Sequence, residues 1–275
     1  MINNSNNIIY RELKIDEISE TVNLVRKCFD KQIVNTWIYG CDGIVDFIKE
    51  QVKLPKKLSN VFYFVAEAEN KILGFAEFKS HLKYIFLNYI AVSQENRAKG
   101  VGSNLLASSV NSIIKPNHEE LFLDVYEDNV IAMRWYSRLG FEKVFNSYLC
   151  EVELTGSYEP YNTSIIQYPQ AEAVQKRFGF SQFNLLSENS NYLVGRIGND
   201  WFKLFDENIL NDINALCTLK KLDQKRRFLI LLKDDSISNY SNKQIKINII
   251  KKIERLCFNL KVVNKTDPFF SSSHD

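Results

Sequence analysis

The sequence has few of the residues on which metalloenzymes and disulfide-rich proteins depend. Its 275 residues include only three histidines, which are far apart in the chain. The five cysteines are odd in number and widely spaced, so they suggest neither a metal-ligand cluster nor a disulfide framework. We therefore expect no metal site and a reduced, cytoplasmic protein.

Long apolar segments are also missing. The first ten residues contain neither a basic region nor an apolar core, which argues against a secretory signal. The longest aliphatic and aromatic runs, such as residues 228–232, are far shorter than a membrane span, so we expect no membrane partner. With 45% hydrophobic and 25% charged residues, the chain has a globular composition and is long enough for one large domain or two ordinary ones.

Charge is distributed unevenly along the chain. The formal net charge is +2, yet residues 218–265 carry 13 Lys and Arg against four Asp and Glu. A basic region of this kind can bind nucleic acid or another polyanion. It is also typical of a solvated helix face, and no alternation of aromatic and basic residues like that of an RNA-binding motif is present. Nucleic acid is therefore a possible partner but not the favoured one.

The most informative stretch is residues 84–106. An apolar run ends at Val92, a polar loop with two glycines follows, and a helical pattern then begins, which predicts a strand, a loop and a helix. Backbone N–H groups at such a helix start lack internal partners and bind phosphate. Because Lys99 precedes Gly100, the loop is not a Walker loop, and Leu105 replaces the third glycine of a dinucleotide fingerprint.

Two motifs in this region resemble a known family. The segment Arg97-Ala98-Lys99-Gly100-Val101-Gly102 resembles the Gln/Arg-x-x-Gly-x-Gly/Ala pyrophosphate loop of the GCN5-related N-acetyltransferase (GNAT) superfamily. About thirty residues later, residues 128–141 resemble its late helix, Asn-x-x-Ala-x-x-x-Tyr-x-x-x-Gly-Phe, with all five marker positions present. The resemblance covers residues 8–154, and residues 123–141 are similar to the ribosomal-protein alanine acetyltransferase branch.

The predicted elements of residues 8–154 follow the order β-α-α-β-β-β-α-β-α-β. Strand–helix–strand units indicate some parallel pairing, and the tight turn at Asn70-Lys71 indicates an antiparallel hairpin. We expect an α/β (α+β) fold with a mixed, largely antiparallel sheet flanked by helices. The resemblance implies that strands 84–92 and 121–126 splay apart into a V-shaped cleft that holds the coenzyme.

The chain is expected to contain two related domains. Residues 1–155 would form the acetyltransferase domain, residues 156–163 a linker, and residues 164–275 a second α/β domain. The second order, β-α-β-β-β-α-β-α-β, repeats the first with one helix fewer. It includes predicted helices at 206–220 and 245–257 and a closing strand at 260–263. We hypothesise a degenerate second GNAT-like domain that binds no coenzyme, because no Gly-x-Gly follows its fourth strand, at residues 201–205.

The resemblance implies acetyl transfer from acetyl-coenzyme A to a primary amine, by direct attack on the thioester in a ternary complex. The amide-like pantetheine arm would pair with the exposed edge of the strand before the loop, as an added strand would, and a backbone N–H there would stabilise the thioester oxygen. The expected coenzyme-binding residues are Ile90, Ala91, Val92, Arg97, Ala98, Lys99, Gly100, Val101, Gly102, Ser103, Asn129 and Tyr136.

Three residues are candidates for catalysis. Tyr136 matches the position of a tyrosine that protonates the departing thiolate, and a phenol with a pKa of about 10 is protonated at neutral pH. The alternative is a core aromatic beside Trp135. Asp124 lies in mid-strand, where the similar branch has a glutamate assigned as the base; the alternative is a carboxylate bonded to backbone. Asn88 would orient a water or the acceptor, and Glu77 is a weaker candidate.

The acceptor is left open between a small molecule and a peptide amine, and so is the oligomeric state. The resemblance places one wall of the acceptor site on residues 29–54, and acids there would suit a cationic amine. Two other functions compete with catalysis: a non-catalytic coenzyme-binding or regulatory module, and an RNA- or ribosome-associated protein that uses the basic C-terminal region. The polar and aromatic residues expected in the wall are Trp37, Tyr39, Asp42, Asp46 and Glu50.

Overall fold

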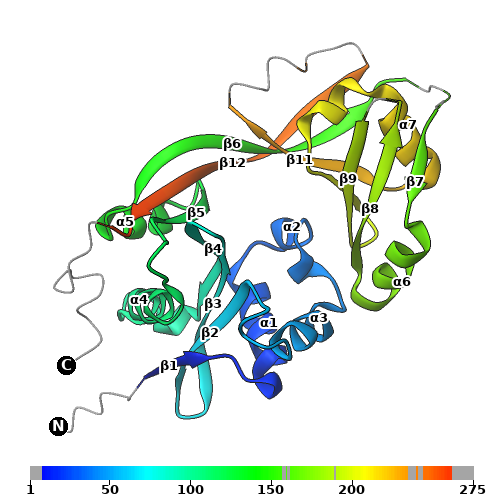
Figure 1. The fold of residues 1–275 in the computed structure, drawn as a ribbon. Coiled ribbons are helices and arrows are strands. Elements are labelled where there is room, and N and C mark those ends of the chain that lie inside the picture. Colours follow the sequence, from blue (N-terminus) through cyan, green and yellow to red (C-terminus); the bar gives the residue numbers. More distant parts are fainter. Residues whose placement is uncertain are drawn as a thin grey trace, which may run out of the picture.

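A computed structural model describes residues 8–261, except 157–158, 160–161, 189, 235–239 and 241–243. We call β1 to β6 the first half and β7 to β12 the second half (Figure 1). The elements of the first half are β1 (Ile9–Glu12), α1 (Ile18–Cys28), α2 (Lys31–Val34), α3 (Ile44–Val52), β2 (Val61–Ala68), β3 (Lys71–Ser80), β4 (Tyr84–Val92), α4 (Val101–Ile113), β5 (Glu120–Tyr126), α5 (Val130–Arg138) and β6 (Glu142–Leu154).

The second half repeats much of this order with fewer helices. A short 3-10 helix, η4 (Glu207–Asn211), precedes its second α-helix. Its other elements are β7 (Ser164–Ile166), α6 (Tyr168–Phe178), β8 (Phe180–Ser187), β9 (Ser190–Ile197), β10 (Trp201–Leu204), α7 (Ile213–Leu222), β11 (Arg227–Lys233) and β12 (Ile245–Asn259).

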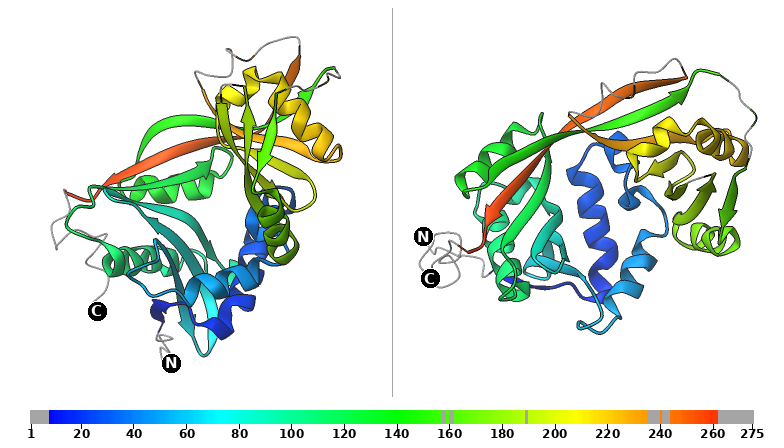
Figure 2. Two further views of the ribbon diagram at one scale, coloured as in Figure 1. Left: turned by 45° about the vertical axis from the view of Figure 1, so that its right-hand side comes forward. Right: turned by 45° about the horizontal axis from the view of Figure 1, so that its top comes forward.

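One 12-stranded sheet connects the two halves, in the order β1-β2-β3-β4-β5-β12-β6-β11-β10-β9-β8-β7. Read from either end, five strands lead to the same central pair, β12 and β6. The fourth and fifth strands of each series, β4–β5 and β10–β11, are the parallel pairs. The last strand of the second half therefore lies inside the first half, between β5 and β6, and the long β6–β12 ribbon spans both halves (Figures 1 and 2).

The strand β12 corrects the expected helix at 245–257. Of the expected strand at 260–263, Leu260 and Lys261 form a turn, and residues 262–263 lie outside the described residues. Ile245, Ile247 and Ile249 alternate as in a strand, but register shifts after Ile249 and after Arg255 interrupt the alternation. These irregularities give the later apolar residues a spacing that resembles a helical one. The division into domains 1–155 and 164–275 stays a proposal, and most of the expected linker, 156–163, lies outside the described residues.

Other predicted boundaries differ from the structure for local reasons. Before the first α-helix, residues 15–17 form a 3-10 turn in which the Glu17 carboxylate accepts from the Lys14 N–H at 3.0 Å. The expected helix 206–220 divides into η4 and α7, because Asp212 caps α7 by accepting from Ala215 N–H at 2.9 Å. Such side-chain caps fix helix starts that hydrophobic spacing alone does not locate.

Helices cover both faces of the first half of the sheet. Helices α4 and α5 pack on one face, around Leu106 and Val110. Helices α1 and α3 pack on the opposite face, around Val22 and Ile48. The second half has its own core, which includes Phe183, residues of α7 and the outer part of β6. In the part of the chain that the structure describes, no helix is both long and apolar enough to cross a membrane.

The position of β12 inside the first half explains much of the uneven charge along the chain. Basic residues of β12 pair with acids of the first half: Lys252 with Glu127 at 2.5 Å, and Arg255 with Asp124 at 2.5 Å. Lys251 also pairs with Asp128. A basic last strand thus lies beside an acidic β5 edge, and much of the positive charge that suggested a polyanion partner is matched within the chain.

Candidate functional site

Strands β4 and β5 separate halfway along their length. Their parallel pairing runs from Tyr84 and Glu120 to Leu87 and Leu123 and then stops. Beyond this point β4 continues against β3, and β5 continues against β12. A bulge at Asn88 marks the separation, since Leu87 and Tyr89 oppose successive residues of β3. The splay that the resemblance implied is therefore present, and the β4 segment from Ile90 to Val92 pairs with β3 on one side and with no strand of the described residues on the other.

The loop after β4 ends in a helix start without a side-chain cap. Ala98 and Gly100 have positive φ angles of 58° and 79°, and Gly100 is the N-cap of α4. Because glycine has no side chain to accept from the first turn, the N–H groups of Val101, Gly102 and Ser103 remain available to a ligand. Each of these residues belongs to the expected pyrophosphate loop, so the local geometry fits a phosphate group.

Side chains from neighbouring elements hold this loop. The Arg97 side chain donates to the Val92 carbonyl at 3.1 Å, which ties the loop to the end of β4. Trp135 Nε1 of α5 donates to Ser103 Oγ at 2.9 Å. A Cβ atom on Gly102 would lie 3.4 Å from the Trp135 ring, so a small residue is needed where α5 packs against α4. The exposed Lys99 adds positive charge to the loop.

The α5 motif has the expected local geometry. The Asn129 side chain caps α5 by accepting from Ala132 N–H at 3.1 Å, and Gly140 has a φ of 87° just beyond the helix. Tyr136 is buried beside Phe141, with ring centroids 5.4 Å apart. Burial raises the pKa of Tyr136, so the phenol is protonated at neutral pH. The acid role of Tyr136 stays a prediction, and its protonation state is the one that role requires.

Asp124 lies where the cleft begins, but its carboxylate is already paired. Arg255 of β12 donates to it through two nitrogens, at 2.5 and 2.7 Å. The guanidinium also lies 5.0 Å from the Phe86 ring centroid and 5.2 Å from that of Phe145. Sequence reasoning missed Arg255, because no local signal indicates that β12 pairs with β5. A base role for Asp124 remains a prediction, and it would have to operate beside this cation.

A buried polar cluster lies on the other side of the bulge. The Glu77 carboxylate accepts from the Tyr39 hydroxyl at 2.6 Å and from the Asn88 amide at 2.5 Å. Glu77 is only 3% exposed, and burial raises its pKa. Glu77 therefore fixes the orientation of Asn88 at the point where β4 leaves β5. The sequence indicated both residues as polar interruptions of apolar strands, but it did not indicate that they are bonded.

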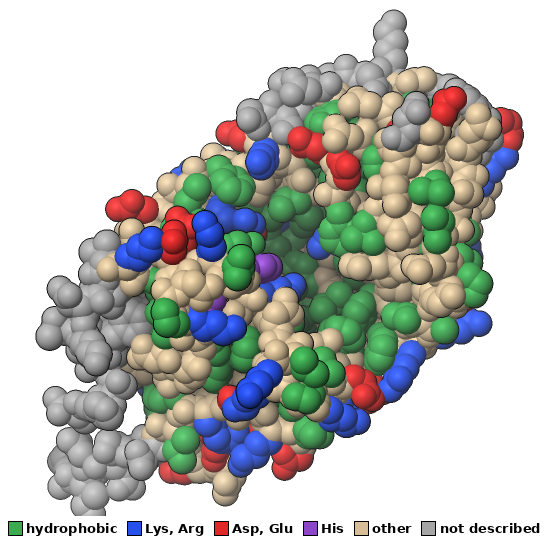
Figure 3. Space-filling model, viewed as in Figure 1, with side chains coloured by type: hydrophobic (Ala, Val, Ile, Leu, Met, Phe, Trp, Pro, Cys, Tyr) green, Lys and Arg blue, Asp and Glu red, His purple; other side chains and the backbone are tan. Residues whose placement is uncertain are grey.

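Aromatic side chains form a wall beside the separated strands. Trp37 stacks on Tyr126 of β5, with centroids 6.2 Å apart and planes 5° apart, and lies 5.1 Å from Tyr89 of β4. Two of the expected wall residues, Trp37 and Tyr39, are thus next to the splay. The space-filling view shows a hollow with apolar and basic side chains between the halves (Figure 3).

The expected acids of that wall lie elsewhere. Asp46 pairs with Lys49 on the surface of α3 at 3.4 Å, and Glu50 pairs with Arg177 of α6 at 2.8 Å. Asp42 lines a separate cavity between the halves. The acidic residues of 29–54 therefore give no support to a cationic acceptor. Within the described residues, no group of three or more His, Cys, Asp or Glu side chains is arranged to hold a metal ion.

Over its described residues, the second half has neither a free strand edge nor an uncapped helix start at the corresponding position. All four residues of β10 pair with β11, and β10 ends at Leu204, so no free strand edge continues past the pairing. Asp206 then accepts from Asn208 N–H at 2.9 Å, and Asp212 caps α7. Carboxylates thus occupy the helix starts where a phosphate would otherwise bind, and they would repel it.

Comparisons with known proteins agree with this geometry. Residues 34–141 match the model of the "Acetyltransferase (GNAT) family". An N-alpha-acetyltransferase of Saccharolobus solfataricus is 31% identical over 149 residues, which cover 49% of this chain and 80% of that protein.

Two solved structures resemble nearly the whole fold. A proposed acetyltransferase from Pyrococcus horikoshii aligns with a TM-score of 0.62 at 13% identity, covering 98% of this chain and 95% of its own. A tandem GNAT protein from the clavulanic acid biosynthesis pathway aligns with a TM-score of 0.61 at 10% identity, covering 92% and 98%. The tandem arrangement expected from the sequence thus has a structural counterpart.

Proposed function

Because this chain belongs to the acetyltransferase (GNAT) family, we propose that its first half transfers an acetyl group from acetyl-coenzyme A to an α-amino group at the N-terminus of a polypeptide. The observation that carries the proposal is the open edge of β4 next to the uncapped start of α4. The N-terminal acceptor rests on the relative from Saccharolobus solfataricus, whose printed name specifies α-amino acetylation.

Each part of the coenzyme has a matching surface in the first half. Backbone N–H groups of Val101, Gly102 and Ser103 would bind the pyrophosphate, with Arg97 and Lys99 adding positive charge nearby. The backbone edge at Ile90, Ala91 and Val92 would pair with the pantetheine amides. A backbone N–H of this edge would then stabilise the charge that develops on the thioester oxygen, an effect of roughly 3 kcal/mol for one well-placed donor.

Proton transfer would use groups on either side of the separated strands. Tyr136 would protonate the departing thiolate, because burial keeps its phenol in the acid form. The Asn88 amide nitrogen is held by Glu77, so its carbonyl oxygen is oriented to accept from the attacking amine or from a water. Glu77 acts in this arrangement as a positioning residue. Asp124, paired with Arg255, is a second candidate for accepting the proton of the amine.

The acceptor would approach from the side of Trp37 and Tyr126. The β6–β12 ribbon passes above α2, which precedes Trp37 in the chain (Figure 1), and the surface is hollowed between the halves (Figure 3). A polypeptide N-terminus offers a primary amine at the end of an extended chain, which suits a groove open at one side. The second half would then act as one boundary of the acceptor groove and bind no coenzyme of its own.

The first experiment is a calorimetric titration of acetyl-coenzyme A, followed by an assay of thiol release with a panel of short peptides. We expect one coenzyme site per chain and turnover with peptides that have a free N-terminus. Peptides blocked at the N-terminus but containing lysine are the matched control and should be inactive. Turnover with lysine alone would overturn the proposed acceptor. Coenzyme binding without any turnover would support the non-catalytic alternative.

The variant Tyr136→Phe tests the acid role within this proposal. Removing the hydroxyl should lower kcat about 100-fold while the affinity for acetyl-coenzyme A stays within about twofold. Tyr192→Phe in the second half removes a hydroxyl from a buried ring far from the cleft, and it should leave kcat unchanged. Equal activity of the wild type and Tyr136→Phe would show that Tyr136 is only a core aromatic.

A further inference from the structure

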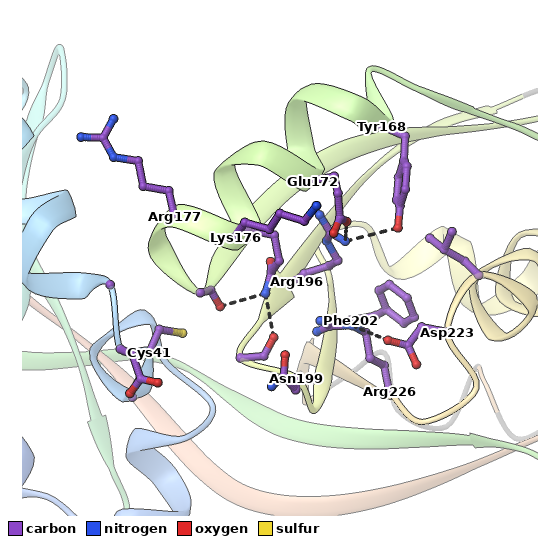
Figure 4. A pocket seen from close by; sticks show the side chains of 17 residues that line it. Cys41, Tyr168, Glu172, Lys176, Arg177, Arg196, Asn199, Phe202, Asp223 and Arg226 are labelled. Atoms are coloured by element: carbon purple, nitrogen blue, oxygen red, sulfur yellow. Dashed lines mark hydrogen bonds and ion pairs between the residues drawn. The ribbon is translucent and has the colours of Figure 1, made fainter.

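A second cavity lies between the halves, away from the coenzyme cleft. It has a volume of about 540 Å³ and is bounded by α6, the start of β10 and the turn before β11 in the second half, and by residues Gly40 to Gly43 of the first half (Figure 4). The cavity is at the amino ends of β10 and β11, whereas a GNAT coenzyme site would lie beyond the carboxyl ends of such strands. The proposed function makes no use of it.

The wall of this cavity contains a buried guanidinium with unused donors. Arg226 is 5% exposed. Its Nε donates to Asp223 at 3.0 Å and its Nη1 to the Trp201 carbonyl at 3.1 Å, whereas Nη2 donates to no group within the described residues. Burial lowers the pKa of Arg226, as expected for a cation with incomplete compensation. Nη2 is not among the fully buried side-chain atoms that lack a partner, so it is accessible from the cavity, and an anion there would accept from it.

A second buried arginine has its donors almost fully used. Arg196 is 4% exposed and donates to Ser181 Oγ at 2.9 Å, to Glu172 at 2.8 Å and to the Ala171 carbonyl at 2.9 Å. It also donates to the Tyr168 hydroxyl at 3.4 Å. Arg196 therefore neutralises Glu172 and builds the rigid side of the cavity.

The lining carries four basic and three acidic side chains, and most of them are paired. Asp223 is bound to Arg226, and Glu172 is bound to Arg196. Lys176 of α6 makes no ion pair within the described residues, and its side chain extends along the same side of the cavity as Glu172 and Arg196 (Figure 4). One acid of the lining, Asp42, is exposed. The neighbouring Arg177 points away and pairs with Glu50.

We propose that this cavity binds a small organic anion, with a carboxylate or phosphate group held by Arg226 Nη2 and Lys176. The planar guanidinium offers the donor geometry that both kinds of oxyanion accept, and the ammonium of Lys176 contributes charge. The volume exceeds that of a bare ion, and the ring of Tyr168 lines the space for the organic part. Asn199 supplies a further amide at the turn between β9 and β10.

The ligand would contact both halves at a close junction. A Cβ atom on Gly43 would lie 2.4 Å from the Arg177 carbonyl oxygen and from Phe178 Cα, so α3 and α6 approach each other through this glycine. The loop that lines the cavity directly follows Tyr39, which donates to Glu77 at 2.6 Å. An anion in the cavity is therefore expected to stabilise the junction and the loop that supports the acceptor side of the catalytic site.

Binding is tested on the full chain with two probes, inorganic phosphate and citrate. Coenzyme A is present at saturation, so that the loop after β4 does not bind the probe. We expect one equivalent of at least one probe to bind by calorimetry and to raise Tm, and the stronger probe separates a phosphate from a carboxylate ligand. Absence of heat and of any Tm increase with both probes at about 10 mM would overturn the proposal.

Three variants locate the site. Arg226→Gln should weaken probe binding at least about tenfold, and Lys176→Gln about threefold. The matched control is Arg227→Gln, since Arg227 is the next residue but stacks on Trp201 and pairs with Glu151 outside the cavity. Equal binding by Arg226→Gln and Arg227→Gln would overturn the proposal. If Arg226→Gln does not fold, the test rests on Lys176→Gln, because Lys176 is exposed and its replacement should not affect folding. Unchanged probe binding by Lys176→Gln would then overturn the proposal.

Discussion

The two halves of this protein share a strand order but differ at the point where a coenzyme would bind. In the first half, β4 continues past its last pair with β5, and the next helix begins at an uncapped glycine. In the second half, β10 ends with its last pair, and aspartates cap the helices that follow. The comparison shows that the shared scaffold is compatible with coenzyme binding but does not provide it. In our proposal, the free strand edge and the uncapped helix start provide it.

Removal of β12 is expected to have the largest effect, because it breaks the arrangement common to both halves. A chain that ends at residue 244 loses the strand that pairs with both β5 and β6. Exposed edges and the lost core residues Leu256 and Phe258 should abolish cooperative unfolding in calorimetry. A chain that ends at residue 261 keeps β12 and serves as the control. A cooperative transition in the shorter chain would show that the first half folds without β12.

The variant Gly100→Val tests the proposed difference in coenzyme binding between the two halves. Gly100 has a φ of 79°, where a β-branched residue is strained, and its backbone begins the expected phosphate site. We expect acetyl-coenzyme A affinity to fall at least about tenfold in a calorimetric titration. Gly198→Val introduces similar strain at a φ of 55° in the second half, with no atom within 4 Å, and should leave that affinity unchanged. A loss of affinity in both variants would point to general destabilisation.

A smaller effect is expected from Glu77→Gln, and it depends on pH. Burial raises the pKa of Glu77 in the folded state, so the folded protein binds this proton more tightly than the unfolded chain does. The stabilisation is complete below the ordinary glutamate pKa of about 4.3 and is lost as pH rises through the raised native value. The free energy of unfolding, measured by denaturant titration from about pH 4 to 8, should therefore depend less on pH in the variant.

The control for this measurement is Glu153→Gln on the exposed part of β6, where the carboxylate is about half exposed. That variant should keep the pH dependence of the wild type. Identical pH dependence in the wild type and Glu77→Gln would contradict a raised pKa for Glu77. It would leave the hydrogen bonds to Tyr39 and Asn88 as the contribution of this residue.

The smallest effect is expected for a salt bridge that joins the halves at the surface. Arg177 of α6 and Glu50 of α3 are 2.8 Å apart, but their side chains are 59% and 45% exposed. Solvent screens such a pair, so Arg177→Gln should lower the free energy of unfolding by less than about 1 kcal/mol. A larger loss in denaturant titration would mean that the junction of the halves depends on this charge pair more than on the close contact at Gly43.

Local sequence signals predicted much of the first half. The loop from Arg97 to Ser103, the Asn129 cap and the left-handed Gly140 were all recognisable, because each depends on residues within a few positions. The polar residues Asn88 and Asp124 were correctly placed on the two strands that separate. Their partners were not predicted, because Glu77 reaches Asn88, and Arg255 reaches Asp124, only through strand pairing.

The sequence by itself determined the family, the position of the glycine loop before α4 and most of the order of elements as far as β11, because helix caps, glycines and hydrophobic periods act over short distances. Only the tertiary structure decided that β12 lies between β5 and β6, and therefore that Arg255 faces Asp124 and that the two halves enclose a cavity. The register of β12 is set by contacts between residues about 90 to 140 positions apart, and bulges within β12 obscure its alternation. Charge and apolar surface on the facing strands select that register.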